Sequence, residues 1–200
     1  TYLRNLEEKK QQVLSVIEEQ GKLTPELKKQ ILAAETLVVV DDLYRPYRPK
    51  RRTRATIAKE KGLEPLANLI RLQLTKRPLE EDAKAFLSEE KEVLTVEDAL
   101  NGARDILAEA ISDEADYRIH IRDLTMKEGT LISTARDEKA QSVYENYYSY
   151  EEPVSKVAGH RILAINRGEK EKFLTVQVGA PEERILRSLE HMVISYENPQ

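Results

Sequence analysis

Apolar residues at helical spacing, each series opened by a helix-capping residue, constrain the fold of this chain more than any other feature. The clearest case is Thr95-Val96-Glu97-Asp98, a capping-box pattern in which side chains and backbone amides satisfy each other at a helix start. The apolar residues that follow it at intervals of three or four are Leu100, Ala103, Leu107 and Ile111. This segment therefore predicts an amphipathic helix.

Similar signals recur along the chain and predict a mainly α, multihelical fold. Glycine (7 of 200 residues) and proline (8) are sparse, so few positions interrupt helices. Thr24 followed by Pro25 suits a helix cap and first turn. The helices expected from the pattern cover residues 2–20, with Lys10 interrupting the apolar stripe, and 25–35, 53–61, 66–74, 78–89, 95–111, 116–134, 137–150 and 181–195. Residues 37–40, Leu-Val-Val-Val, are compatible with either a strand or a buried helical turn.

One small β-hairpin is expected near residues 161–178. Leu174, Val176 and Val178 alternate with polar residues, as in a half-buried strand. They follow residues 161–165 across a polar turn at residues 166–169, which favours pairing of the two segments. We predict three regions: helices with the basic strip over 1–92, a helical, helix-turn-helix-like region over 93–152, and the hairpin with a helix over 153–200.

Positive charge is concentrated in residues 45–61, the basic strip. It holds eight Lys and Arg against one Glu, a net charge of +7 in a chain whose total is −4. The stretch begins with two prolines, Pro46 and Pro49, which predict an extended, non-helical path. A concentrated positive segment in an acidic chain indicates a partner.

The basic strip supplies the candidate nucleic-acid-binding residues. Cations release counterions from phosphates, and aromatic faces stack on unpaired bases. The candidates are Arg45, Tyr47, Arg48, Lys50, Arg51, Arg52 and Arg54. The alternative is structural, because arginines can pair with carboxylates of a neighbouring helix and tyrosines can act as half-buried anchors.

No residue pattern indicates catalysis, a metal site or a cofactor. The three histidines, at positions 120, 160 and 191, lack metal-ligand spacing and have no nucleophile motif beside them. No phosphate-binding glycine loop occurs, and the acidic clusters, Asp113-Glu114 among them, are expected at helix ends or in solvent. Tyr144, Tyr147 and Tyr148 would share one helix face, where packing is favoured over base stacking. We therefore expect a non-enzymatic protein without metal or cofactor.

Cysteine is absent, which suits a cytoplasmic protein, and no apolar run is long enough to span a bilayer. We expect no membrane partner. The chain starts at Thr1 inside a helical pattern, so we expect it to be a segment of a longer protein.

Three motifs resemble the Tex family of transcription accessory proteins. Residues 43–55 resemble that family's DLYxPYKPKRRTRA stretch, and residues 103–109 resemble its GAxDIxAE helix. Residues 155–169 are similar to its KIPSHRxLAxNRGE segment, although Val157-Ala158-Gly159 stands where a Pro-Ser pair is common. A second departure is the Val38-Val39-Val40 run before the aspartates.

The resemblance implies the multihelical N-terminal region of a nucleic-acid-binding protein. In that family an RNase H-like domain, a helix-hairpin-helix unit and an OB-fold RNA-binding domain lie downstream, outside these residues. Three functions follow as hypotheses. The first is a scaffold that adds phosphate contacts to RNA or DNA binding by those other domains. The second is a module that docks onto transcription machinery or its own C-terminal domains. The third, remote, is a hydrolase using acidic residues.

Overall fold

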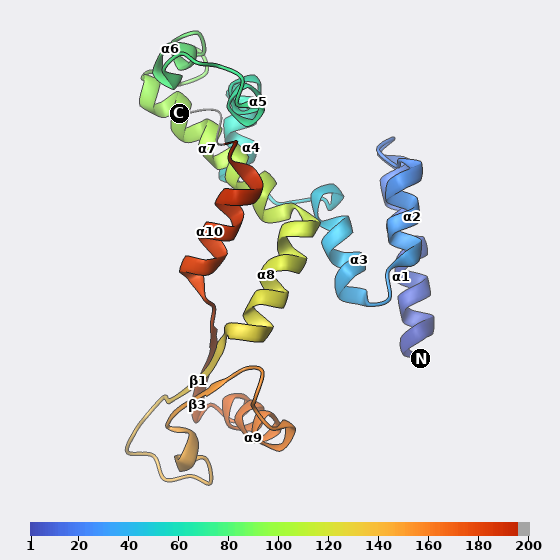
Figure 1. Cartoon of the computed structure of the whole chain (residues 1–200), viewed down its shortest axis with the longest axis vertical. Coiled ribbons are helices and arrows are strands. Elements are labelled where there is room, and N and C mark those ends of the chain that lie inside the picture. The colour runs from blue at the N-terminus through green and yellow to red at the C-terminus, as the bar shows by residue number, and fades with distance from the viewer. Residues whose placement is uncertain (196–200) are drawn as a thin grey trace. The chain divides into compact units, whose positions relative to one another are not determined.

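The structure, a computed structural model, describes residues 1–195 and is mainly α-helical (Figure 1). It divides into two compact units, each treated by itself. Unit 1 comprises Thr1–Ile119 and, of the described residues, 193–195; unit 2 comprises His120–Met192. The three-region division predicted from the sequence, including its helix-turn-helix-like part, stays a prediction.

Unit 1 is built from helices. They are α1 (Tyr2–Glu19), α2 (Pro25–Ala33), α3 (Leu37–Tyr44), the 3-10 turn η1 (Arg45–Tyr47), α4 (Arg54–Glu60), α5 (Glu64–Leu72), α6 (Leu79–Lys84), α7 (Val96–Asp113) and the start of α8 (Ala115–Glu128). Residues 37–40 are thus helical. The helix expected over 78–89 is shorter, because residues 85–94 turn back through a bridge between Ser88 and Val93.

Capping side chains start several of these helices. The predicted capping box of α7 is confirmed, with Thr95 Oγ1 accepting from the Asp98 amide at 3.0 Å and Asp98 accepting from the Thr95 amide at 3.0 Å. Hydrogen bonding to the Asp98 carboxylate, first by the Thr95 side chain and then by the Thr95 backbone amide, holds the pKa of Asp98 below its usual value. Thr24 caps α2 in the same way at 3.1 Å, as predicted.

Two apolar clusters hold unit 1 together. One joins α1, α2 and α3 around Ile17, Ile31 and Val40, which are fully buried. Lys10, expected to interrupt the stripe of α1, is itself buried, and its Nζ donates to Leu32 O at 2.8 Å. The other cluster packs α4, α5, α6 and α7 around Leu63 and residues of α7.

Unit 2 contains a three-stranded antiparallel sheet in the order β2-β1-β3. Its strands are β1 (Thr130–Ala135), β2 (Ser149–Pro153) and β3 (Leu174–Gly179), with η2 (Glu145–Tyr147) before β2, α9 (Gly159–Lys170) before β3 and α10 (Glu182–Val193) after it. The strand predicted near residues 174–178 is present as β3, but the pairing predicted for it with residues 161–165 is wrong. β3 pairs with β1, Leu131 lying opposite Val178, while residues 161–170 are helical.

Two other helix predictions in this region are wrong. The helix expected over 116–134 ends at Glu128, and β1 follows because it is the central strand that both β2 and β3 need for their backbone hydrogen bonds. Residues 137–150, expected as a helix, form a loop, η2 and the start of β2. The region over 93–152 is therefore not wholly helical.

The tyrosines of that loop nevertheless pack, as favoured from the sequence. Tyr144 is buried with Ile165 and Leu174, and Tyr147, Tyr148 and Tyr150 pack around these three. Gly168 lets α9 pack closely against Leu174 of β3, because an added Cβ would lie 2.6 Å from Leu174 Cδ1. The expected turn at residues 166–169, Asn-Arg-Gly-Glu, lies within α9.

Candidate nucleic-acid interface

The basic strip changes conformation along its length. Pro46 lies inside η1 and not on an extended stretch, since proline is tolerated in a first helical turn. Residues 48–53 are non-helical, as expected for the stretch around Pro49. Thr53 then caps α4, accepting from the Thr56 amide at 3.1 Å. The path brings the strip alongside the C-terminal half of α7.

α7 presents a row of acids to the strip. Asp105, Glu109 and Asp113 are four residues apart, so they lie on one helix face. Asp113 was expected in solvent, but it is buried, with 9% of its side chain exposed. We call these three residues the acidic row.

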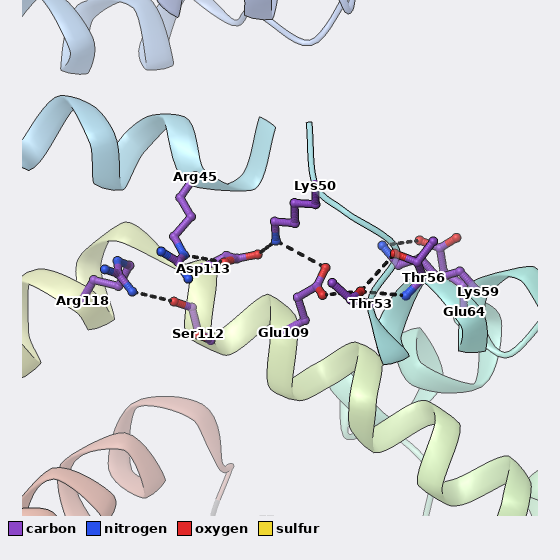
Figure 2. A network of polar contacts seen from close by, with 10 residues as sticks. All are labelled: Arg45, Lys50, Thr53, Thr56, Lys59, Glu64, Glu109, Ser112, Asp113 and Arg118. Atoms are coloured by element: carbon purple, nitrogen blue, oxygen red, sulfur yellow. Dashed lines mark hydrogen bonds and ion pairs between the residues drawn. The ribbon is translucent and has the colours of Figure 1, made fainter. Parts of the chain in front are cut away.

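Two cations of the strip are held by the acidic row (Figure 2). Arg45 Nε donates to Asp113 Oδ1 at 2.8 Å. Lys50 Nζ bridges the other Asp113 oxygen and Glu109 Oε1, the latter at 3.3 Å. Glu109 Oε2 also accepts from Thr53 Oγ1 at 2.8 Å. The structural alternative therefore holds for Arg45 and Lys50, which fix the strip to α7.

Two more cations make weaker, exposed pairs. Arg54 Nε lies 3.8 Å from Asp105 Oδ1, with 87% of the arginine side chain exposed. Arg52 pairs with Glu60 at 2.8 Å, but both side chains are more than half exposed. Pairs this exposed contribute little to stability and exchange readily with other anions.

Arg48 and Arg51 are exposed, and neither guanidinium has an ion-pair partner among residues 1–195. Together with six other strip residues they form one wall of an open groove of about 670 Å³; Tyr47 and Arg52 do not line it. The opposite wall is the acidic row with Ala108 and Ser112. Five cations of the strip and three carboxylates line this groove, so the acidic row reduces the local charge from +5 to +2.

A family model described as Tex central region-like matches residues 74–198, more than half of the chain. The chain belongs to the Tex family. The family resemblance carried by the three sequence motifs is thereby confirmed.

Several proteins from bacteria and human are similar to this chain over most of its length. Protein YdcI of Bacillus subtilis (strain 168) is 48% identical over 196 residues, 96% of this chain and 27% of the relative. Transcriptional accessory protein Tex of Neisseria gonorrhoeae is 39% identical over 180 residues, 88% of this chain and 23% of the relative. S1 RNA-binding domain-containing protein 1 of Homo sapiens is 28% identical over 186 residues, 88% of this chain and 18% of the relative. The chain thus spans about a quarter of the bacterial relatives.

Tyr47 occupies a different position from the arginines in this Tex-family chain. It is half-buried and packs against the cluster of α1, α2 and α3. Its carbonyl accepts from Gln20 Nε2 at 2.8 Å. Tyr47 therefore anchors the start of the strip. This is the half-buried role that the structural alternative gave to the tyrosines.

The acidic row was missed from the sequence, although its spacing was visible. Asp105, Glu109 and Asp113 repeat at four residues opposite the apolar stripe of the same helix. A second missed pair joins Asp42, which is buried, to Arg118 Nε at 2.8 Å. Neither pairing partner could be identified without the fold, because the residues lie 50 or more positions apart.

The described residues show no arrangement of three or more His, Cys, Asp or Glu suited to a metal ion. No helix in residues 1–195 has the length and apolar character needed to cross a membrane.

His120 contacts Ser188 at 2.6 Å within unit 2. In unit 2, the Glu152 carboxylate accepts hydrogen bonds from Tyr150 and, at 2.9 Å, from Arg161. Hydrogen bonds from Tyr150, then Arg161, lower the pKa of Glu152, and the same contact raises the pKa of Tyr150.

Proposed function

We propose that this region is a non-enzymatic scaffold of a Tex protein that contributes contacts to the phosphate backbone of RNA or DNA. The observation that carries the proposal is the free state of Arg48 and Arg51, exposed on a strip that other cations pin in place. Pinning reduces the conformational entropy lost when a phosphate binds. Two relatives are named as a transcriptional accessory protein and an S1 RNA-binding domain-containing protein, which supports a role in transcription with nucleic acid as partner.

The contribution of this region to binding is small on these grounds. The acidic row cancels part of the positive charge, and within the basic strip only Arg48 and Arg51 lack a carboxylate partner among the described residues. Most of the affinity for nucleic acid would come from other parts of the longer Tex protein. The proposal places the protein in the cytoplasm, in keeping with the absence of cysteine from its sequence.

The test is the salt dependence of oligonucleotide binding by the 200-residue chain. Each phosphate contact adds about 0.9 to the slope of log affinity against log salt for duplex DNA, and about 0.7 for single strands. The double variant Arg48→Gln/Arg51→Gln should therefore lower the slope by about 1.4 to 1.8. The matched control is Arg4→Gln/Arg71→Gln, which removes two exposed arginines outside the strip. Equal slopes for the double variant and the wild type would reject the proposal.

A second candidate is docking onto protein partners, either transcription machinery or C-terminal domains of the same Tex protein. The observation that favours it is apolar exposure in unit 2, where Leu163 of α9 is 71% exposed and Leu186 of α10 is 60% exposed. No residue of α10 is buried. Substitutions Leu163→Ser and Leu186→Ser that left partner capture unchanged in pull-downs with full-length Tex domains would count against this function.

A further inference from the structure

A smaller pocket adjoins the groove in unit 1. The two cavities share Arg54 and Asp105, and the smaller one has a volume of about 220 Å³. Its other lining residues come from α4, from the connection between α4 and α5, from the turn before α7 and from the first half of α7. Arg48 and Arg51, which make the proposed phosphate contacts, do not line this pocket.

The charge balance differs between the two cavities. The groove lining has a net charge of +2, whereas the pocket is lined by Arg54 and Lys61 against three carboxylates, those of Glu92, Asp98 and Asp105. The pocket therefore sums to −1. A phosphate is favoured in the groove and disfavoured in the pocket.

The pocket is small, and its lining is partly apolar and partly polar. Its apolar residues are Ile57, Ala58, Leu63 and Val93. Gly102 adds no side chain there, and an added Cβ would lie 2.3 Å from Leu63 Cδ1. A volume below the roughly 300 Å³ at which pockets for drug-sized ligands begin fits a single ring system better than a whole nucleotide.

Polar groups at the pocket have free bonding capacity. Asn101 Oδ1 accepts from Arg104 at 3.0 Å, while its Nδ2 has no partner in the described part of the chain. Within residues 1–195, Asp105 has only the 3.8 Å pair with Arg54, whose guanidinium is exposed and available to stack on a base. Carboxylates accept hydrogen bonds from exocyclic amino groups, as acidic residues do from cytosine N4.

We propose that the pocket accommodates one unpaired nucleobase with an exocyclic amino group while the adjoining phosphates lie in the groove against Arg48 and Arg51. The ligand is thus a single-stranded nucleic acid, since a base inside a duplex reaches such a pocket only after costly unpairing. This inference rests on the proposed phosphate contacts. It adds a site that recognises base chemistry.

The test measures binding of the 200-residue chain to homopolymers of about 12 nucleotides, within the range that single-strand sites cover. Oligo(C) is compared with oligo(U), both as RNA, with oligo(dC) and oligo(dT) to separate RNA from DNA, and with a duplex. We expect cytosine strands to bind about fivefold or more tightly than uracil or thymine strands, the factor for one base-edge contact of about 1 kcal/mol.

The main variant is Asn101→Leu, which removes the amide and narrows the pocket on an exposed helix position. Its matched control is Asn68→Leu, the same change at an exposed position of α5. Asn101→Leu should abolish the cytosine preference and leave the salt slope unchanged, whereas Asn68→Leu should keep both. Asp105→Asn, which keeps the size of the side chain, should also reduce the preference and serves if Asn101→Leu fails to fold.

The outcomes separate the two proposals. Equal affinity for cytosine and uracil strands, equal affinity for duplex and single strand, or a preference that survives both pocket variants would overturn the base pocket. The phosphate contacts would still stand if Arg48→Gln/Arg51→Gln lowers the salt slope. If wild type binds no oligonucleotide at about 50 mM salt, where phosphate contacts are strong, both proposals are rejected.

Discussion

Replacing Asp113 by alanine should destabilise unit 1, because Asp113 is the main attachment of the basic strip to α7. The substitution removes the acceptor of Arg45 Nε at 2.8 Å and of Lys50 Nζ. A hydrogen bond to a charged group contributes about 1.5 to 3 kcal/mol when the acceptor is desolvated, as this one is with 9% exposure.

Three features reduce that figure. Arg45 is 45% exposed, so water can solvate it after the change, and Lys50 keeps Glu109 at 3.3 Å. Asp113 is also the last residue of α7, where negative charge opposes the helix dipole and its removal gains about 0.5 kcal/mol. The expected net loss is about 2 kcal/mol.

The assay is urea unfolding followed by far-ultraviolet circular dichroism. With a slope of about 2 kcal/mol per M, the midpoint should fall by about 1 M. Because the chain has two units, hydrogen exchange of the α4 and α7 amides reports the loss in unit 1 separately. The matched control is Asp105→Ala on the same helix face, whose 3.8 Å pair with an 87% exposed arginine should cost at most about 0.5 kcal/mol. Equal losses for Asp113→Ala and Asp105→Ala would refute the assignment of Asp113 as the attachment.

Two further predictions concern stability. Gly102→Ala should destabilise by about 1 to 3 kcal/mol in urea unfolding despite the better helix propensity of alanine, because its Cβ would meet Leu63 Cδ1 at 2.3 Å; a stabilised variant would contradict the packing. Glu152, whose pKa is lowered first by Tyr150 and then by Arg161, contributes stability above its unfolded-state pKa and loses it as the pH falls through its folded-state pKa. The stability of unit 2, measured by hydrogen exchange, should therefore decrease less as the pH falls in Glu152→Gln than in wild type.

Local signals in the sequence predicted helix starts well. Thr24 and Thr95 cap their helices as expected, because a cap depends on side-chain and backbone groups within three residues. The alternation of residues 174–178 also predicted a strand correctly. Its partner could not be found the same way, since β1 lies about 40 residues earlier and the nearer segment 161–165 had turn-like residues after it.

The candidate interface shows the same division. Charge counting located the basic strip, and family motifs identified the chain as Tex. The count could not tell which cations are neutralised, because Arg45 and Lys50 meet carboxylates of α7 more than 50 residues away, while Arg48 and Arg51, in the same stretch, meet none among residues 1–195.

The sequence alone determined the helical character, the caps, the positive strip and the family, since each depends on neighbouring residues or on a motif. Only the tertiary structure decided the strand partner of β3, the burial of Asp113 and the small pocket beside Arg54. These depend on which distant segments pack together, and burial changes the interaction energy of a charge far more than its position in the sequence does.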